Sequence, residues 1–431
     1  MPGRREHRAV LTQRNVMQLG RRHLLCCGAA VAAGLFTRLG RAAILNPCES
    51  GALPAELHDF VQQSLAGLDP QQLWDSHCHL LGTGDAGSGC RIHPSLTQWW
   101  HPVESLRRRF ILNGACVAPD VPSVDRAYVE RLHALAADFP AGARWLLFAF
   151  DAAFDAAGRE RPEWTTFYVP NDYAREVAAA DPARFVWVAS IHPYRADALA
   201  RLDAAIAAGA VALKWLPSSM NIDLRDARLK PFYDRLARAR MPLIVHCGEE
   251  RAVPGAGRDE LGNPLLLRAP LAQGVTCIAA HCASLGSALD LDQRRPGRAD
   301  AFALFARLMD ERHPKLLGDV SALFQVNRDA AVWRTVLTRV DWHPRLLHGS
   351  DYPLPGVGPL FRPAALAHAG LLAEAEVAPL ERLREHNPLL FDLALQRRAR
   401  WQGQSLSPEV FATRHHFEGL TSSPSSAKAQ A

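Results

Sequence analysis

Short apolar segments separated by amphipathic stretches recur along the chain and predict buried β-strands alternating with helices. Helical patterns such as 197–208, 230–240 and 301–312 lie between the apolar segments. Strands buried on both faces and joined by helices form a parallel sheet that is covered on both sides. The expected strands are 73–79, 145–150, 185–191, 211–215, 242–246, 276–281, 316–321 and 345–351. Eight such units predict an α/β fold, a closed (β/α)8 barrel of the TIM type.

An open, doubly wound sheet is the alternative arrangement of the same elements. That fold usually carries a Gly-x-Gly-x-x-Gly turn after its first strand, where it binds a dinucleotide. The chain has no such turn after 73–79. We therefore favour the barrel.

The segments outside the strands define the expected domain organisation. Residues 44–72 are predicted to form a connector and a helix, and residues 73–400 the barrel domain. The long interval 82–144 after the first strand is predicted to be a helical insertion, and loops of such length are usually functional. Residues 401–431 lose periodicity and contain a serine-rich run, so we expect a disordered tail.

Residues 1–43 have the pattern of a targeting segment. The pair Arg21-Arg22 directly precedes a mildly apolar run over 26–36 that is too short to span a membrane. A small-residue pattern, Gly40-Arg41-Ala42, follows, and the whole resembles a twin-arginine export signal. A basic, alanine-rich helix is the alternative. We expect an exported or periplasmic protein if the signal is used, a cytoplasmic protein otherwise, and no membrane span after processing.

Charge and cysteine content exclude two classes of protein. The formal net charge is +5, but residues 1–43 hold eight arginines and one acid, which leaves 41 basic and 43 acidic residues in the remainder. This balance gives no indication of nucleic-acid binding. The nine cysteines include no Cys-x-x-Cys pair, so a disulfide scaffold is not expected. We expect Cys78, Cys247 and Cys282 to be small buried side chains.

The first expected strand ends in two histidines, His77 and His79, followed by a glycine-rich loop. Side chains alternate faces along a strand, so these two histidines share a face with their Cα atoms about 7 Å apart. Two imidazoles at this spacing can bind one metal ion. The alternative is a pair of half-buried histidines whose hydrogen bonds are made by the backbone.

Ionisable residues also close four other strands, at the barrel end where active sites of this fold lie. They are Lys214, His246, His281 and Asp351. Ionisable side chains at the ends of several buried strands are costly unless they share a partner, and a divalent metal ion is the simplest one. Imidazoles with a carboxylate suit zinc best, and also iron, manganese or cobalt.

Roles for the remaining candidates follow from this hypothesis. Asp351 is expected to accept a proton from a water molecule, and His281 to polarise the substrate or to protonate the leaving group. His192 either lines the pocket or is structural, and Asp319 either lines the pocket or orients a metal-binding histidine. Glu249 and Glu250 are expected to lie in a solvated loop.

Four motifs together resemble the amidohydrolase superfamily, in particular the amidohydrolase-2 branch that includes aminocarboxymuconate-semialdehyde decarboxylase. They are Asp75-x-His77-x-His79, the strand ends at His246 and His281, and Gly349-Ser350-Asp351-Tyr352-Pro353. The resemblance implies a TIM-like barrel with a zinc-type ion bound by His77, His79, His246 and Asp351. It also implies that His281 is a histidine near the reacting group or a ligand of a second ion.

The resulting functional hypothesis is a metal-dependent hydrolase that uses water to cleave a C–N or C–O bond of a small molecule. A metal-dependent, non-oxidative decarboxylase is the alternative, and a metal-free binding barrel is a third. Lys214 stands where binuclear relatives carry a carboxylated bridging lysine. We favour one ion over two, with Lys214 binding a substrate carboxylate or pairing with an acid.

Overall fold

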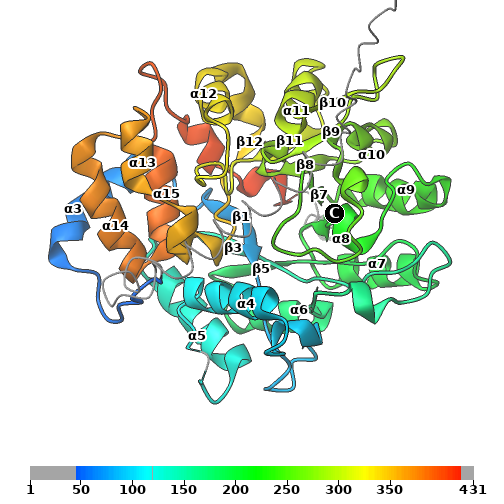
Figure 1. Ribbon diagram of the computed structural model, residues 1–431, viewed down its shortest axis with the longest axis horizontal. Coiled ribbons are helices and arrows are strands. Elements are labelled where there is room, and N and C mark those ends of the chain that lie inside the picture. Colours follow the sequence, from blue (N-terminus) through cyan, green and yellow to red (C-terminus); the bar gives the residue numbers. More distant parts are fainter. Residues whose placement is uncertain (1–44, 119, 419–431) are drawn as a thin grey trace, which may run out of the picture. The chain divides into compact units, whose positions relative to one another are not determined.

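The computed structural model describes residues 45–118 and 120–418 (Figure 1). The predicted export signal, residues 1–43, therefore lies outside the described residues. No helix in the described part of the chain is long and apolar enough to cross a membrane.

All eight predicted barrel strands are present, and they form the centre of the fold (Figure 1). Their bounds are β1 Trp74–His79, β3 Arg144–Phe148, β5 Phe185–Val188, β6 Leu213–Trp215, β7 Leu243–His246, β8 Cys277–Ala280, β11 Leu316–Asp319 and β12 Leu346–Leu347. Parallel pairing gives the orders β1-β3-β5 and β12-β11-β8-β7-β6. Parallel bridges between Ala189 and Leu213 and between Cys78 and Tyr352 connect these two groups. The strands thus form a ring, which confirms the (β/α)8 prediction.

Alternate strand residues fill the inside of the ring. Ile244 and Ile278 belong to a buried cluster with Leu146, whereas their strand neighbours Leu243 and Cys277 pack in the outer core. Period-two alternation therefore separates an inner layer from the layer beneath the helices. The free cysteines Cys78, Cys247 and Cys282 are buried, as expected.

Helices cover the outside of the strands. The predicted segments 197–208, 230–240 and 301–312 correspond to α7, α9 and α11. The bounds are α6 Asn171–Ala180, α7 Ala198–Ala207, α8 Pro217–Met220, α9 Lys230–Ala239, α10 Arg268–Ala272, α11 Ala301–Asp310, α12 Ala330–Thr338, α13 Pro363–His368, α14 Val377–His386 and α15 Pro388–Arg398. Side-chain caps fix several starts: Asp300, for example, accepts a hydrogen bond from the Ala303 amide at the start of α11.

The insertion after β1 is helical, as predicted, and contains α4 Pro102–Gly114 and α5 Val124–Ala137. It also contains β2 Arg91–Ile92, which pairs with β4 Phe167–Tyr168. The buried carboxylate of Asp125 in α5 accepts hydrogen bonds from the amides of Thr83 and Gly84 and from the Ser88 hydroxyl. Asp125 thereby fixes the glycine-rich loop that follows β1.

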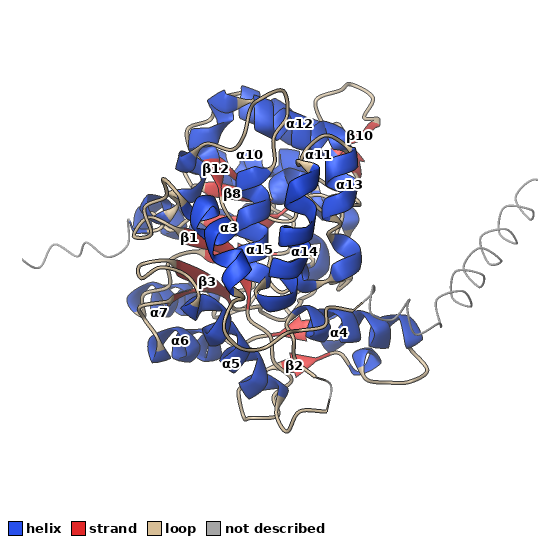
Figure 2. Cartoon of the chain, turned by 90° about the vertical axis from the view of Figure 1, so that its left-hand side faces the viewer, coloured by secondary structure: helices blue, strands red, loops and turns tan. Residues whose placement is uncertain are grey.

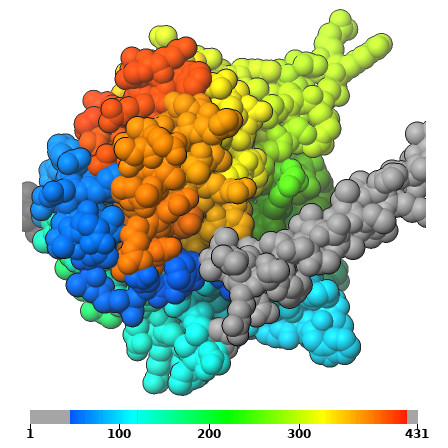
Figure 3. Space-filling model, turned by 60° about the vertical axis from the view of Figure 1, so that its left-hand side comes forward, coloured from blue at the N-terminus to red at the C-terminus, as the bar shows by residue number. Residues whose placement is uncertain are grey.

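The N-terminal segment is attached to the last helices of the barrel. Helix α3, Ala55–Leu65, packs against α14 and α15, and Figure 2 shows the three helices together. In the space-filling view these early residues (blue) lie against the surface of the late helices (orange) (Figure 3). The Glu49 amide donates to the Glu385 carbonyl at 2.9 Å, so the contact includes the backbone.

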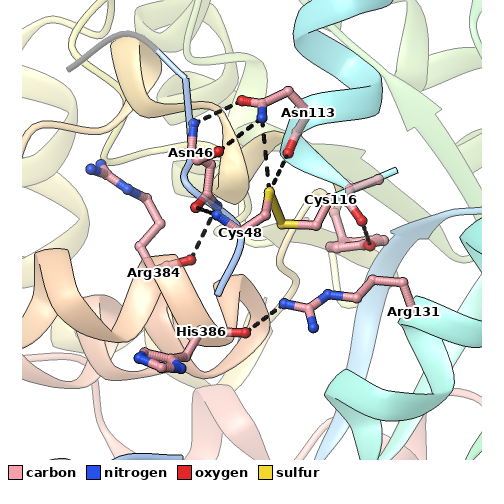
Figure 4. The surroundings of a disulfide bond; sticks show 9 residues. Asn46, Cys48, Asn113, Cys116, Arg131, Arg384 and His386 are labelled. Carbon is pink, nitrogen blue, oxygen red and sulfur yellow. Dashed lines mark hydrogen bonds between the residues drawn. A yellow bond between two sulfur atoms is a disulfide. The ribbon is translucent and has the colours of Figure 1, made fainter. Parts of the chain in front are cut away.

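A disulfide joins Cys48 to Cys116, just after the end of α4 (Figure 4). Beside it, the side chain of Asn113 accepts from the Asn46 amide at 2.8 Å and donates to the Asn46 carbonyl at 2.9 Å. This bond was not predicted, because the spacing of the two cysteines follows no local sequence pattern. It ties the start of the described chain to the insertion.

The prediction of a disordered tail is wrong for residues 401–418. Val410, Phe411 and Phe417 are buried, and Phe417 packs with Trp74 in the inner layer of the barrel. Thr413 accepts a hydrogen bond from the Trp74 amide at 3.1 Å. This segment covers the end of the barrel where β1 begins. It is ordered by burying side chains against the barrel and not by forming a regular helix or strand, so its lack of sequence periodicity did not imply disorder. Residues 419–431 lie outside the described residues.

Candidate metal centre

Three of the four predicted metal ligands converge at the ends of β1 and β12. Asp351 Oδ1 lies 3.1 Å from Nε2 of His79 and 3.5 Å from Nε2 of His77. The two imidazole rings are 5.2 Å apart, centroid to centroid. One ligand atom from each of the three residues lies within 4.8 Å of the other two, a spacing that permits binding to one ion.

Asp75 fixes the register between these two strand ends. Its Oδ1 accepts hydrogen bonds from the His77 amide at 3.0 Å and from the Ser350 amide at 2.9 Å. The Asp351 amide in turn donates to the His77 carbonyl at 2.7 Å. Asp351 has a left-handed backbone with φ of 61°, which costs about 1 kcal/mol or more for a residue other than glycine. These hydrogen bonds maintain it.

Asp319, at the end of β11, lies behind His77 rather than in the pocket. Its Oδ2 is 2.9 Å from Nδ1 of His77 and its Oδ1 accepts from the His281 amide at 2.9 Å. Burial, followed by the charge of Lys214, lowers the pKa of His77 well below its usual value, so the ring is neutral. The Asp319 carboxylate accepts a hydrogen bond from the protonated Nδ1, which leaves the Nε2 lone pair of His77 facing Asp351.

His281 is part of the same hydrogen-bond network. Its ring stacks on His77 at 4.6 Å, and its Nδ1 lies 2.8 Å from Oγ of Ser321. The Ser321 hydroxyl donates to Asp319, so it accepts from His281 Nδ1. Burial also lowers the pKa of His281 well below its usual value. The network therefore assigns a neutral His281 whose Nε2 carries a free lone pair.

A second cluster of metal-binding residue types consists of His77, His281 and Asp319. The hydrogen bonds just described use both carboxylate oxygens of Asp319. In the first cluster, the only hydrogen bond to His77 Nε2 among the described residues is a long one, 3.4 Å, from Lys214 Nζ. We therefore place the candidate ion beside His77, His79 and Asp351.

His246, the fourth predicted ligand, lies at the margin of this group. It ends β7, and its ring is 5.2 Å from that of His281. Its Nε2 is buried and has no hydrogen-bond partner, although Oε2 of Glu250 lies 3.3 Å away. A buried nitrogen without a partner fits a metal ligand, because such an atom is otherwise costly. The donor set as a whole thus fits a divalent ion.

Lys214, at the centre of β6, is buried with Nζ 3.4 Å from Nε2 of His77. Burial lowers the pKa of Lys214 to about 8, although the charges of Asp319 and Asp351 oppose the decrease. Within residues 45–118 and 120–418, no carboxylate lies within ion-pair distance of this ammonium group. The lysine is therefore available to an ion or a substrate.

Two predicted pocket residues do not line the cavity. His192 is fully buried, and its Nε2 contacts the Met220 carbonyl at 2.7 Å while Nδ1 accepts from the Tyr194 amide. Burial lowers the pKa of His192 to about 3, which is typical of a structural histidine. Asp319 is shielded by His77. Glu250, which we expected in a solvated loop, instead faces His246 with little exposure.

The candidate ligands form the base of a cavity of about 420 Å³. Helix α4 of the insertion contributes Arg107, Phe110 and Ile111 to its wall. The loop after β11 contributes Gln325 and Arg328. Sequence reasoning missed these five residues because none ends a barrel strand.

The sequence matches one family model, and the fold is similar to several solved structures. A family model described as amidohydrolase matches residues 74–389. Similar solved structures include an uncharacterized TIM-barrel protein from Bordetella bronchiseptica, 17% identical over 65% of this chain and 86% of that chain, with a TM-score of 0.44. Another is 5-carboxyvanillate decarboxylase from Sphingomonas paucimobilis, 12% identical over 81% and 97%, with a TM-score of 0.45. A search of curated proteins found no match.

Proposed function

The chain belongs to the amidohydrolase-2 family, and on this premise we propose that it is a metal-dependent hydrolase that cleaves a C–N or C–O bond of a small molecule. The observation that carries the proposal is the convergence of His77 Nε2 and His79 Nε2 on Asp351 Oδ1 at the base of the cavity. Amides, lactones and ester-like carbonyls are the expected substrates.

We propose His77, His79, His246 and Asp351 as the residues that would hold a single ion, most suitably zinc, with iron, manganese or cobalt as alternatives. When bound, such an ion lowers the pKa of water towards neutrality and polarises a carbonyl group. Asp319 supports this arrangement by fixing the tautomer of His77.

Asp351 is the proposed base. Burial raises the pKa of Asp351, although its hydrogen bond to His79 opposes the increase, and a raised pKa makes a carboxylate a better proton acceptor. We propose that His281 Nε2, with its free lone pair, accepts that proton and delivers it to the leaving group. The Ser321 and Asp319 hydrogen bonds hold the ring in this tautomer throughout.

A decarboxylase is the second candidate, and Lys214 is the observation that favours it. An unpaired ammonium 3.4 Å from His77 Nε2 can bind a substrate carboxylate beside the ion. Product analysis separates the two reactions. Incubation with lactones, N-acyl amino acids and hydroxybenzoates should give a new carboxylate with an amine or alcohol for a hydrolase, and CO₂ for a decarboxylase. Turnover that survives complete removal of metal by a chelator would contradict both.

We propose that the protein is exported. The Cys48–Cys116 disulfide supports this location, because disulfides persist mainly in oxidising compartments. Cell fractionation of the natural chain and of an Arg21→Lys/Arg22→Lys variant tests it. Export should depend on the pair, and equal cytoplasmic retention of both proteins would contradict the proposal.

A further inference from the structure

Two arginines in the cavity wall have no ion-pair partner. Arg107 comes from α4 and Arg328 from the loop after β11, and neither forms an ion pair with any described residue. The guanidinium of Arg328 makes one hydrogen bond, to Asn327 Oδ1 at 3.3 Å. The Nε of Arg328 and the Nη1 of Arg107 are buried without a partner. A third arginine of the wall, Arg251, pairs with Glu249 at 3.0 Å.

Unpaired charge in a partly buried position is costly, so it indicates a missing counter-charge. Burial lowers the pKa of Arg328 to about 10, which still leaves the side chain charged at neutral pH. The cavity as a whole has a cationic excess that a divalent ion would increase. Its charged lining residues are Arg107, Lys214, Arg251 and Arg328 against Glu249, Glu250 and Asp351.

Gln325 adds a neutral donor next to this charge. Its side chain is buried, and its amide nitrogen Nε2 has no hydrogen-bond partner. It precedes Arg328 by one turn of the same loop, and both residues line the cavity. An arginine and an amide group together match the acceptor oxygens of a carboxylate.

The remainder of the wall is apolar, which restricts the other part of the ligand. Aromatic and aliphatic side chains within or just after β3 and β4, just after β6, and in the segment after β12 surround the cavity. They include Phe148, Phe150, Phe167, Val169, Leu216 and Leu354. A wall of this kind favours an aryl or alkyl body over a sugar or a nucleotide.

We propose that the substrate is an amphipathic carboxylate, whose carboxylate group binds Arg328 and Gln325 with Arg107 as a second cation, and whose apolar body fills the cavity. This inference rests on the proposed function, since it leaves the scissile bond at the metal centre. The insertion after β1 then sets specificity, because its helix α4 supplies Arg107 from outside the barrel.

Two probes of nearly equal shape, neither with a hydrolysable bond, test the proposal: 4-phenylbutanoate and its neutral methyl ketone analogue 5-phenylpentan-2-one. Calorimetric titration of the purified, metal-containing protein should show that the carboxylate binds at least about tenfold more tightly than the ketone. A difference of this size corresponds to one hydrogen bond to a charged group. Arg328→Gln should reduce this preference about tenfold, and Arg107→Gln should reduce it in the same direction. Arg225→Gln is the control, because Arg225 pairs with Asp223 and does not line the cavity, and it should retain the preference.

A metal-free variant separates this proposal from the proposed function. His77→Ala/His79→Ala should keep the preference for the carboxylate, because Arg328 and Gln325 remain. Loss of the preference in this variant, with full preference in Arg328→Gln, would place the carboxylate at the metal and overturn the arginine subsite while leaving the metal function intact. Equal binding, or no binding, of the two probes to the natural protein would also overturn it. Circular dichroism establishes that each variant is folded.

Discussion

Oδ2 of Asp319 lies 2.9 Å from Nδ1 of His77, on the side of the ring opposite Asp351. The contact connects β11 to β1 past the intervening β12 and presents the Nε2 lone pair of His77 to the cavity. The position of a candidate ligand therefore depends on a residue that does not itself line the cavity.

Asp319→Asn should weaken metal binding about 10- to 100-fold. The reason is that an amide is a weaker acceptor than a carboxylate for the hydrogen bond from Nδ1 of His77. Competition with a chelator of known affinity measures the effect. Asp341→Asn, which removes an exposed carboxylate paired with Arg339, should have no effect. Unchanged affinity in the Asp319 variant would remove Asp319 from the site.

The variant Lys214→Met distinguishes a site that binds one metal ion from a site that binds two. If Lys214 binds substrate, the variant should retain the same metal content as the natural protein, about one ion per chain, while KM increases. If a carboxylated Lys214 bridges two ions, the natural protein should contain about two and the variant fewer. Elemental analysis and steady-state kinetics of the two proteins give the answer, and a natural content of two would contradict our preference.

His192 should make the fold sensitive to acid. Its pKa is about 3 in the folded chain and 6.5 as the ordinary value, so between these pH values the unfolded chain binds a proton that the folded chain does not. Stability therefore decreases as the pH is lowered through 6.5, by about 2 kcal/mol from this group between pH 7 and pH 5.

Urea unfolding at pH 7 and pH 5 measures this contribution. Between pH 7 and pH 5, the free energy of unfolding of the His192→Gln variant should decrease by about 2 kcal/mol less than that of the natural protein. The control variant His368→Gln changes an exposed histidine and should show the same decrease as the natural protein. An identical pH dependence in the His192 variant would contradict the structural assignment.

The Cys48–Cys116 disulfide closes a loop with a sequence separation of 68 residues, and its loss should lower the free energy of unfolding by up to about 4 kcal/mol. Cys48→Ser/Cys116→Ser should show the decrease in denaturant titrations without reductant. Dithiothreitol should destabilise the natural protein to the same extent and leave the variant unchanged. If dithiothreitol destabilised the natural protein and the variant equally, the Cys48–Cys116 disulfide would not be the cause of the destabilisation.

The barrel was predictable because each strand is a continuous apolar segment, and the positions of His77, His79 and Asp351 followed from their places at or just after strand ends, whereas Lys214 lies at the centre of β6. His192 also ends an apolar segment, yet it points into the protein, since strand-end position does not determine which way a side chain faces. The cavity-lining Arg107 and Arg328 and the ordered segment 401–418 depend on contacts between distant segments. Such contacts cannot be predicted from local sequence patterns.

The central claim is that His77 and His79 bind a metal ion, and elemental analysis of the purified protein tests it most directly. The natural protein should contain about one zinc-type ion per chain, and His77→Ala/His79→Ala should contain none. His415→Ala/His416→Ala, which removes two adjacent histidines outside the cavity, should keep the full content. A folded natural protein without metal, or a His77→Ala/His79→Ala variant with undiminished metal, would contradict the account.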